Sequence, residues 1–328
     1  MKKIISVSRR TDIPAFYGDW FMRRLDAGVA GWENPFGGQK YLVSLKPEDV
    51  LAFAFWSKNY RPFLTHLKMI KERGYLCLFN YTITGLPHEF ECNLVPMEDA
   101  IDSFRALARM FSLDHMSWRY DPIVTSEKTD EAFHAVRFEE LARQLQGYTL
   151  RCYFSFAIMY GKVERNFARF ERRNRAGLRD PCTEERIRLA GRLADIASKY
   201  GITLYTCCGD YLISDHIRKA HCVDGDVVSR LYYQGTWKGI DRPTRKECGC
   251  VESTDIGRYD TCPHGCIYCY ANVNKEQAQR AYQQHDPESS FLGYPRAQAE
   301  QIALEIRQKK RTTRQLPSTS QMQLGLDY

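Results

Sequence analysis

Ile4-Ile5-Ser6-Val7-Ser8-Arg9-Arg10-Thr11-Asp12 joins a short apolar run to a polar cluster, and this combination decides the fold. A brief run rich in β-branched residues that stops at polar side chains predicts a buried strand with functional groups at its carboxyl end. The combination recurs along the chain, in segments 41–49, 50–59, 76–85, 116–122, 148–156 and 202–210. We therefore expect a series of buried strands, most of them ending in polar residues.

Amphipathic helical patterns lie between these predicted strands. Apolar residues recur at helical spacing in segments 64–70, 101–111, 134–145 and 190–197. Strands that alternate with helices predict a parallel sheet, and six or seven such units predict an α/β fold of the full or partial (β/α) TIM-like barrel type. The carboxyl ends of the strands build the site in such barrels, so the polar clusters should share one rim.

Three cysteines late in the chain, Cys262, Cys266 and Cys269, are separated by three and two residues. Thiols so closely spaced on one loop can converge on one metal centre. A cubane iron–sulfur cluster normally takes four cysteine thiolates, so a set of three would leave one iron open. The alternative is a structural zinc site, which four Cys or His ligands usually close. Its remaining ligand could be His264, Cys248 or Cys250.

The segment Cys262-Pro263-His264-Gly265-Cys266-Ile267-Tyr268-Cys269-Tyr270-Ala271-Asn272 resembles the cysteine motif of the radical S-adenosylmethionine (SAM) superfamily, and specifically its spore photoproduct lyase and DNA-repair-photolyase-like branch. The resemblance implies a 4Fe–4S cluster whose open iron chelates SAM. It also implies reductive cleavage of SAM to a 5′-deoxyadenosyl radical, an electron donor such as flavodoxin or ferredoxin, and a substrate such as DNA or another molecule containing a nucleobase.

The order of the motifs differs from that of the resembling branch, in which the cysteine loop comes first. Here Thr11 to Tyr17, Ser57-Lys58-Asn59 and Thr82-Ile83-Thr84 with Glu89 and Glu91 precede it, in the same cyclic order. We therefore expect a circularly permuted barrel in which the loop 262–269 lies beside residues 9–12, since the first and last strands of a barrel are neighbours. Over roughly residues 1–275 the chain also resembles a bacterial family known only as a domain of unknown function.

The resemblance assigns candidate roles to residues at the predicted strand ends. The Gly-Gly-Glu segment with which the superfamily holds the SAM amino group is not visible in this sequence. The candidates for SAM contacts are instead Arg9, Arg10, Thr11, Asp12 and Tyr268, the last beside the adenine. The catalytic candidates are Lys58, Arg119 and Asp121. A buried carboxylate at position 121 would need a cation or the substrate as its partner.

Five further cysteines form a second group of candidate ligands: Cys207, Cys208, Cys222, Cys248 and Cys250. They could hold an auxiliary centre, either a second iron–sulfur cluster or zinc. A third reading makes Cys208 or Cys250 a hydrogen-atom donor to a product radical, as a cysteine is in the lyase branch. Twelve cysteines in a reducing compartment favour metal or redox chemistry over disulfides.

Charge and hydropathy limit the remaining functions. A formal net charge of +7 permits a nucleic-acid partner without requiring one. Residues 162–192 hold ten Lys or Arg against five acids, and Arg165, Arg169 and Arg172 would share one helical face, either to meet phosphates or simply as a solvated surface. A zinc-stapled nucleic-acid-binding or adaptor protein is therefore the second functional hypothesis. No apolar run suits a signal peptide or a membrane span, so we expect a cytoplasmic protein without membrane partners.

The chain divides, on these patterns, into a barrel over residues 1–210, a cysteine-rich segment over 211–280 that closes the barrel, and a C-terminal helix and disordered tail over 281–328. The helix is expected from Ser289 to Arg314. The tail ends in Gln323-Leu324-Gly325-Leu326-Asp327-Tyr328, which resembles the peptides that dock on bacterial sliding clamps. A sliding clamp is therefore a further expected partner.

Overall fold

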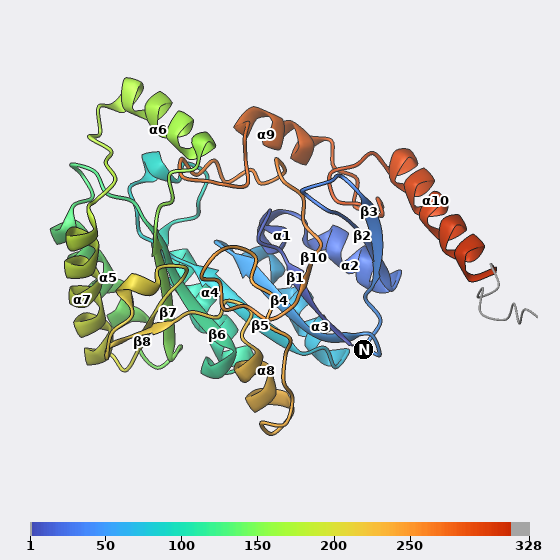
Figure 1. Cartoon of the computed structure of the whole chain (residues 1–328), viewed down its shortest axis with the longest axis horizontal. Helices are drawn as coiled ribbons and strands as arrows, with labels where there is room; N and C mark the ends of the chain where they lie inside the picture. Colours follow the sequence, from blue (N-terminus) through green and yellow to red (C-terminus); the bar gives the residue numbers. More distant parts are fainter. Residues whose placement is uncertain (1, 316–328) are drawn as a thin grey trace, which may run out of the picture.

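A parallel eight-stranded sheet forms the centre of the computed structural model, which describes residues 2–315, with side chains as far as residue 309 (Figure 1). The strand order is β10-β1-β4-β5-β6-β7-β8-β9. The strands are β1 (Lys3–Val7), β4 (Val50–Ser57), β5 (Cys77–Thr82), β6 (Met116–Ile123), β7 (Arg151–Phe156), β8 (Thr203–Thr206), β9 (Ile217–Lys219) and β10 (Thr254–Asp255). This confirms the α/β class and the parallel sheet. Strands β9 and β10 are the two edges, so these strands form no closed barrel.

Helices cover the outer face of this sheet, the face that carries Phe53, Phe79 and Trp118. Alternate residues of each strand point to this face because side chains alternate along a strand. They bury the apolar stripes of the helices in one core of largely aromatic and branched side chains. The helices of this layer are α2 (Gly18–Asp26), α3 (Leu64–Glu72), α4 (Met97–Met110), α5 (Glu131–Leu145) and α7 (Thr183–Lys199). The four predicted helical patterns correspond to the last four of these.

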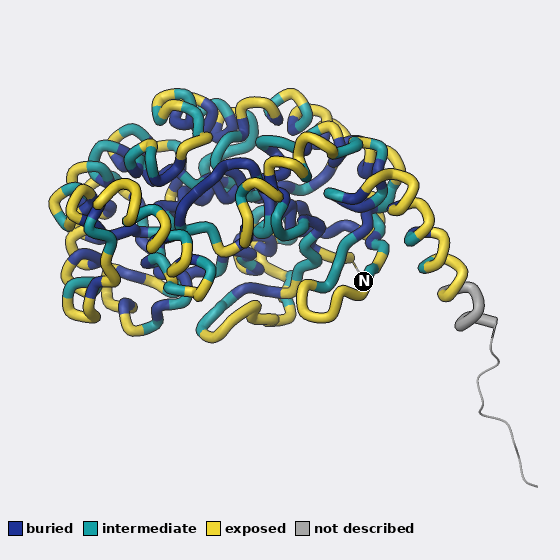
Figure 2. Tube along the Cα trace, turned by 90° about the horizontal axis from the view of Figure 1, so that it is seen from above, coloured by how far each residue is buried: buried dark blue, intermediate teal, exposed yellow. Residues whose placement is uncertain are grey.

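The inner face of the sheet is covered by the later part of the chain. Ile4, Ala54, Leu78 and Tyr153 on this face pack against valines of residues 223–251. This covering segment includes α8 (Gly225–Tyr232) and the residues that lead into β10. Figure 2 shows the resulting distribution, with buried residues gathered in the interior and exposed ones at the periphery.

The remaining elements lie around the ends of the sheet. They are α1 (Ile13–Phe16), β2 (Val29–Glu33), β3 (Lys40–Ser44), the 3₁₀ turns Arg61–Phe63, His88–Phe90, Leu113–His115 and Asp210–Leu212, and the helices α6 (Gly161–Asn174), α9 (Lys275–Gln283) and α10 (Arg296–Gln315). Helices α6 and α9 both lie near the segment that joins β10 to α9 (Figure 1). That segment contains the cysteine loop, defined here as residues 262–269.

Three predictions about individual elements need correction. The run at 41–45 was expected in the parallel sheet, but β3 pairs with β2 in a separate antiparallel hairpin, because residues 34–39 make a turn. Strands β9 and β10 were not predicted, since they have three and two residues and carry no periodicity. The last helix begins at Arg296 rather than near 289, because residues 289–294 pack on the hairpin, where Gly31 donates to the carbonyl of Ser290 at 2.7 Å.

Two observations bear on partners. No helix within residues 2–315 is long and apolar enough to cross a membrane. The tail motif Gln323–Tyr328, on which the expected sliding-clamp contact depends, lies outside the described residues.

Candidate metal centre

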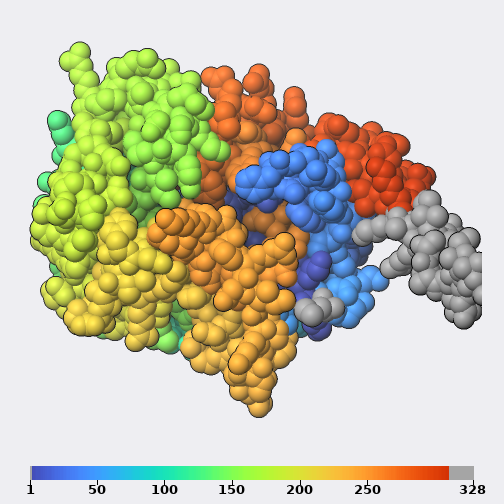
Figure 3. All heavy atoms as spheres, viewed as in Figure 1, coloured from blue at the N-terminus to red at the C-terminus, as the bar shows by residue number. Residues whose placement is uncertain are grey.

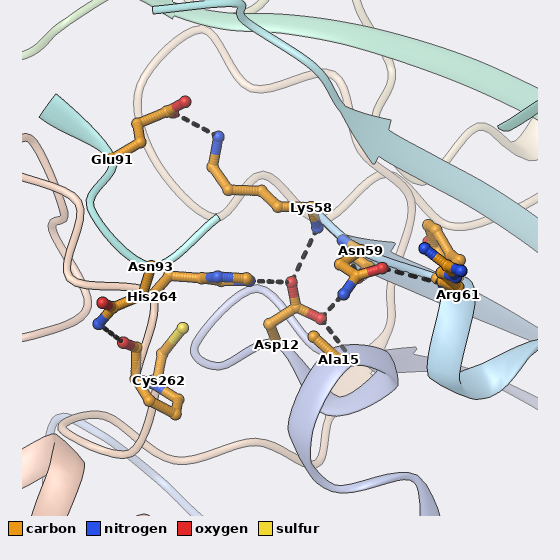
Figure 4. Close-up of polar contacts among 12 residues, drawn as sticks. Asp12, Ala15, Lys58, Asn59, Arg61, Glu91, Asn93, Cys262 and His264 are labelled. Atoms are coloured by element: carbon orange, nitrogen blue, oxygen red, sulfur yellow. Dashed lines mark hydrogen bonds and ion pairs between the residues drawn. The ribbon is translucent and has the colours of Figure 1, made fainter. Parts of the chain in front are cut away.

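Asp12 joins three segments at the carboxyl end of β1 (Figure 4). Its Oδ1 accepts from the backbone N–H of Ala15 at 3.0 Å, which caps α1, and from the Ser57 hydroxyl at 2.7 Å. Its Oδ2 accepts from the backbone N–H of Lys58 at 2.8 Å and lies 2.6 Å from Nε2 of His264. Because Asp12 and His264 are both buried, this carboxylate ties the cysteine loop to the ends of β1 and β4.

Glu91 forms a second junction beside the loop. Its Oε1 pairs with Nζ of Lys58 at 2.7 Å and accepts from the hydroxyl of Tyr268, while its Oε2 accepts from the Thr84 hydroxyl at 2.8 Å. Burial alone would lower the pKa of Lys58, but Glu91 and then Cys266 outweigh it and raise that pKa. Lys58 therefore carries a buried positive charge between the cysteine loop and Glu91.

Hydrogen bonds to backbone carbonyls hold the cysteine loop against residues 90–93. Asn93 donates through Nδ2 to the carbonyl of Pro263 at 2.7 Å, and Ile267 donates from its backbone to Phe90 at 3.0 Å. Gly265 adopts φ +74°, and a Cβ there would lie 2.8 Å from the sulfur of Cys92. Glycine is thus required twice at this turn, by its backbone angle and by the close approach.

The three thiols of the loop lie close enough to influence one another, with Cys266 buried and Cys262 and Cys269 partly buried. Burial raises the pKa of Cys262 and Cys269, and it raises the pKa of Cys266 to about 12 against the opposing charge of Lys58. Lys275 and Lys162 act on Cys269 in the same opposing sense. Burial thus disfavours the thiolate form of these cysteines, while three lysines favour it. A bound metal, which requires thiolates, would suit this environment better than free thiolates.

The loop lies beside the β1 end, as the cyclic order of the motifs predicted. Asp255 of β10 accepts from the hydroxyls of Ser6 and Ser8, at 2.7 and 2.6 Å, and from the backbone of Arg9 at 2.8 Å. The Tyr270 hydroxyl donates to the carbonyl of Arg9 at 2.6 Å. The short strand β10 thus delivers the cysteine loop to the first strand of the chain.

Arg119 and Asp121 lie on the inner face of β6. They form an ion pair, and Asp121 also accepts from the Ser155 hydroxyl. The guanidiniums of Arg119 and Arg9 lie over the two-ring side chain of Trp56, at 5.2 and 5.1 Å from its centroid. Arg9, expected among the SAM contacts, thus lies over Trp56 and is close enough to interact with Cys250 and Cys222.

Each of the five other cysteines influences the pKa of another of that group, and Arg119 donates to the sulfur of Cys222 at 2.9 Å. The group lies at the ends of β8 and β9 and in the segment before β10. Among the residues that the structure describes, no three His, Cys, Asp or Glu side chains already surround a metal position. Metal binding by either group of cysteines would therefore require rotation of their side chains.

Two of the residues predicted to contact SAM, Arg10 and Thr11, do not contact the cysteine loop in the interactions described above. Arg10 donates to the carbonyl of Glu33 at 2.9 Å and lies over the Tyr259 ring, and the buried Thr11 hydroxyl has no hydrogen-bond partner among the described residues. Arg10 lines an open cavity of about 550 Å³ between the β2–β3 hairpin, residues 257–261 and α9. Figure 3 shows a hollow on this face of the molecule, between the blue hairpin and the orange part of the chain. The three cysteines of the loop do not line it.

Several contributors had no clear signal in the sequence. Asn93 and Trp56 belong to no motif, and Arg245, which donates to two cysteine sulfurs, lies in an irregular segment. The sequence predicts His264 only as a zinc ligand, whereas in the structure its Nε2 contacts Asp12. Glu91 belongs to the motif order but is not among the predicted site residues.

Comparison with known proteins gives one result. Residues 4–271 match the model of a family described as a domain of unknown function, DUF1848. No curated protein and no solved structure matches the chain.

Proposed function

We propose that this protein, which belongs to the DUF1848 family, is a radical SAM enzyme whose cluster is held by Cys262, Cys266 and Cys269. The observation that carries the proposal is the position of the cysteine loop. Three mutually interacting thiols, of which Cys266 is buried and the other two are partly buried, lie at the carboxyl edge of a parallel sheet, beside the end of the first strand. Ligand sites in α/β folds lie at this edge.

A cluster at the loop, when bound, would supply the electron that cleaves the sulfonium of SAM to a 5′-deoxyadenosyl radical. The chain's own residues would position and shield the reactants. Asp12 fixes the loop through His264, and Glu91 holds Lys58 and Tyr268. The buried charge of Lys58 would attract the carboxylate of SAM, and the Tyr268 ring offers a flat apolar surface for a base.

The strand order supports a partial, circularly permuted barrel. From β4 to β9 each strand neighbours the next one in sequence, whereas doubly wound sheets reverse at a switch point. Strand β10 lies before β1 in space although it comes last in the chain. The cysteine loop therefore follows the strand that precedes β1, which is the cyclic order of the radical SAM branch that the sequence resembles.

The position and charge of helix α6 support the proposal that the protein binds a polyanionic substrate or an acidic electron donor such as flavodoxin. Its apolar residues Val163 and Phe167 pack in one cluster with Ile267 of the cysteine loop. On its other side Arg165, Arg169 and Arg172 are exposed. A basic surface thus covers the loop, and such a surface binds phosphates or acidic proteins.

A zinc-stapled binding protein is the second candidate, and one observation favours it. Nδ1 of His264 is buried and has no hydrogen-bond partner in the part of the chain that the structure describes, while Nε2 contacts Asp12. Zinc-bound histidines commonly have such a carboxylate on the second nitrogen. His264 with the three cysteines of the loop would complete a closed Cys₃His site.

Anaerobic purification with iron, sulfide and zinc analysis separates the two candidates. The radical SAM proposal expects about four irons and four sulfides per loop cluster. Their loss in Cys266→Ala, with retention in Cys92→Ser as the matched control, would assign the iron to the loop. Added SAM should then alter the electron paramagnetic resonance signal of the reduced protein. A colourless wild-type protein with zinc at the loop would contradict the proposal.

A further inference from the structure

The cysteines outside the loop form one connected group on the inner face of the sheet. The sulfurs of Cys207 and Cys222 lie 3.5 Å apart. The side chains are also close enough to influence the pKa of one another in the pairs Cys207–Cys208, Cys208–Cys248, Cys248–Cys250 and Cys250–Cys222. Five thiols from three separate segments thus form a closed ring of interacting side chains.

Every sulfur of this ring accepts a hydrogen bond from a group outside it. Arg119 donates to Cys222 at 2.9 Å, and Arg245 donates to Cys208 at 2.9 Å and to Cys207 at 3.5 Å. The Thr244 hydroxyl lies 3.5 Å from Cys248, and the Val223 backbone N–H lies 3.4 Å from Cys250. Donors aimed at sulfur favour the thiolate, which is the form that binds metals.

The charges around the ring point the same way. Arg119 is buried, and Arg9 is close enough to interact with Cys250 and Cys222. In the described part of the chain, Arg245 pairs with no carboxylate and directs its guanidinium to sulfurs. These guanidiniums would offset the net negative charge of a metal ion held by four thiolates. Five neutral thiols would need no such compensation.

We propose that these five cysteines provide a second metal centre, built on thiolates and separate from the loop 262–269. Four of the five would ligate, and the centre would tie the ends of β8 and β9 to the segment before β10, holding residues 207–250 across the inner face of the sheet. The inference stands independently of SAM chemistry at the loop.

The spacing favours a single tetrahedral ion. Sulfurs placed about 2.3 Å from zinc lie roughly 3.8 Å from one another, close to the observed contact between Cys207 and Cys222. The thiolates of a cubane sit on separate irons and lie farther apart. The ion expected here is therefore Zn²⁺, one per chain.

Metal analysis of the full-length protein tests the proposal with two opposing variants. A triple variant with Cys262, Cys266 and Cys269 changed to Ala should keep one zinc per chain, whereas Cys222→Ala with Cys250→Ala should lose it. Cys182→Ser, an exposed cysteine outside both groups, is the control. Iron and sulfide in the triple variant would overturn the single-ion assignment. No metal in that variant, when it is folded, would overturn the centre.

A measurement on the unaltered chain avoids dependence on variants that fail to fold. Iodoacetamide labelling followed by peptide mass spectrometry should leave Cys208 and Cys248, which are partly exposed, unlabelled until a zinc chelator is added. Their labelling should then rise at least tenfold, together with release of zinc. Equal labelling with and without chelator, or a disulfide between Cys207 and Cys222, would refute the proposal.

Discussion

Replacing Asp12 tests whether this carboxylate holds the cysteine loop on the sheet. Asp12→Ala removes the acceptor of four donors. The hydroxyl of Ser57 can rotate and the N–H of Ala15 lies at a partly exposed helix start, so the partly buried Lys58 N–H and the buried His264 Nε2 are the groups left without this acceptor. At about 1.5–3 kcal/mol for each bond to a charged acceptor, the loss should be roughly 3–6 kcal/mol.

Asp12→Asn should cost less, for a reason visible in the contacts. The amide oxygen can still accept from Ala15 and Ser57, and the amide nitrogen can donate to a neutral His264, so only the Lys58 N–H loses its acceptor. The expected cost is therefore roughly 1.5–3 kcal/mol. Urea unfolding measures both variants, with Asp215→Asn, an exposed carboxylate, as the control. A cost under about 1 kcal/mol for Asp12→Ala would refute this role of the carboxylate.

Three further predictions concern local features. Gly265→Ala should destabilise the chain by about 1 kcal/mol or more beyond Gly74→Ala, because both glycines have positive φ but only Gly265 meets a neighbouring sulfur; equal free energies of unfolding would contradict this. Burial lowers the pKa of His134 to about 4. Below pH 6.5 this histidine therefore binds a proton in the unfolded chain but not in the folded one. The free energy of unfolding should fall by about 3 kcal/mol between pH 6.5 and 4. His134→Gln should abolish that part of the pH dependence in denaturant titrations, and an unchanged slope would count against it. Changing Arg165, Arg169 and Arg172 to Gln should reduce the salt slope of DNA binding by about 3, since each phosphate contact contributes about 0.9; an unaltered slope in fluorescence anisotropy would remove α6 from the DNA interface.

The sequence predicts the sheet well where strands are long and apolar on the outer face. Runs such as 50–56 and 76–81 carry enough buried residues to be recognised, and each ends where the structure places polar side chains. The hairpin strand at 40–44 has the same local pattern. Its antiparallel partner is decided by the turn at 34–39 and by packing against α10, which local periodicity does not contain.

The candidate site, like the sheet, is predicted by the sequence only in part. Cysteine spacing marks the loop because ligands of one centre can be close in sequence. Its supports, such as Glu91 and Asn93, come from other segments and are brought near only by the fold. The ring of five thiols is intermediate, since the cysteines are visible in the sequence but their closure depends on β8, β9 and the approach to β10 meeting on one face.

Formation of 5′-deoxyadenosine tests the central proposal most directly. The protein, prepared without oxygen and reduced with dithionite, is incubated with SAM, and the products are separated by liquid chromatography with mass detection. The proposal predicts 5′-deoxyadenosine from the wild type and from Cys92→Ser, and none from Cys262→Ala, Cys266→Ala or Cys269→Ala. A wild-type protein that contains its full iron and sulfide but releases no 5′-deoxyadenosine from SAM would contradict it.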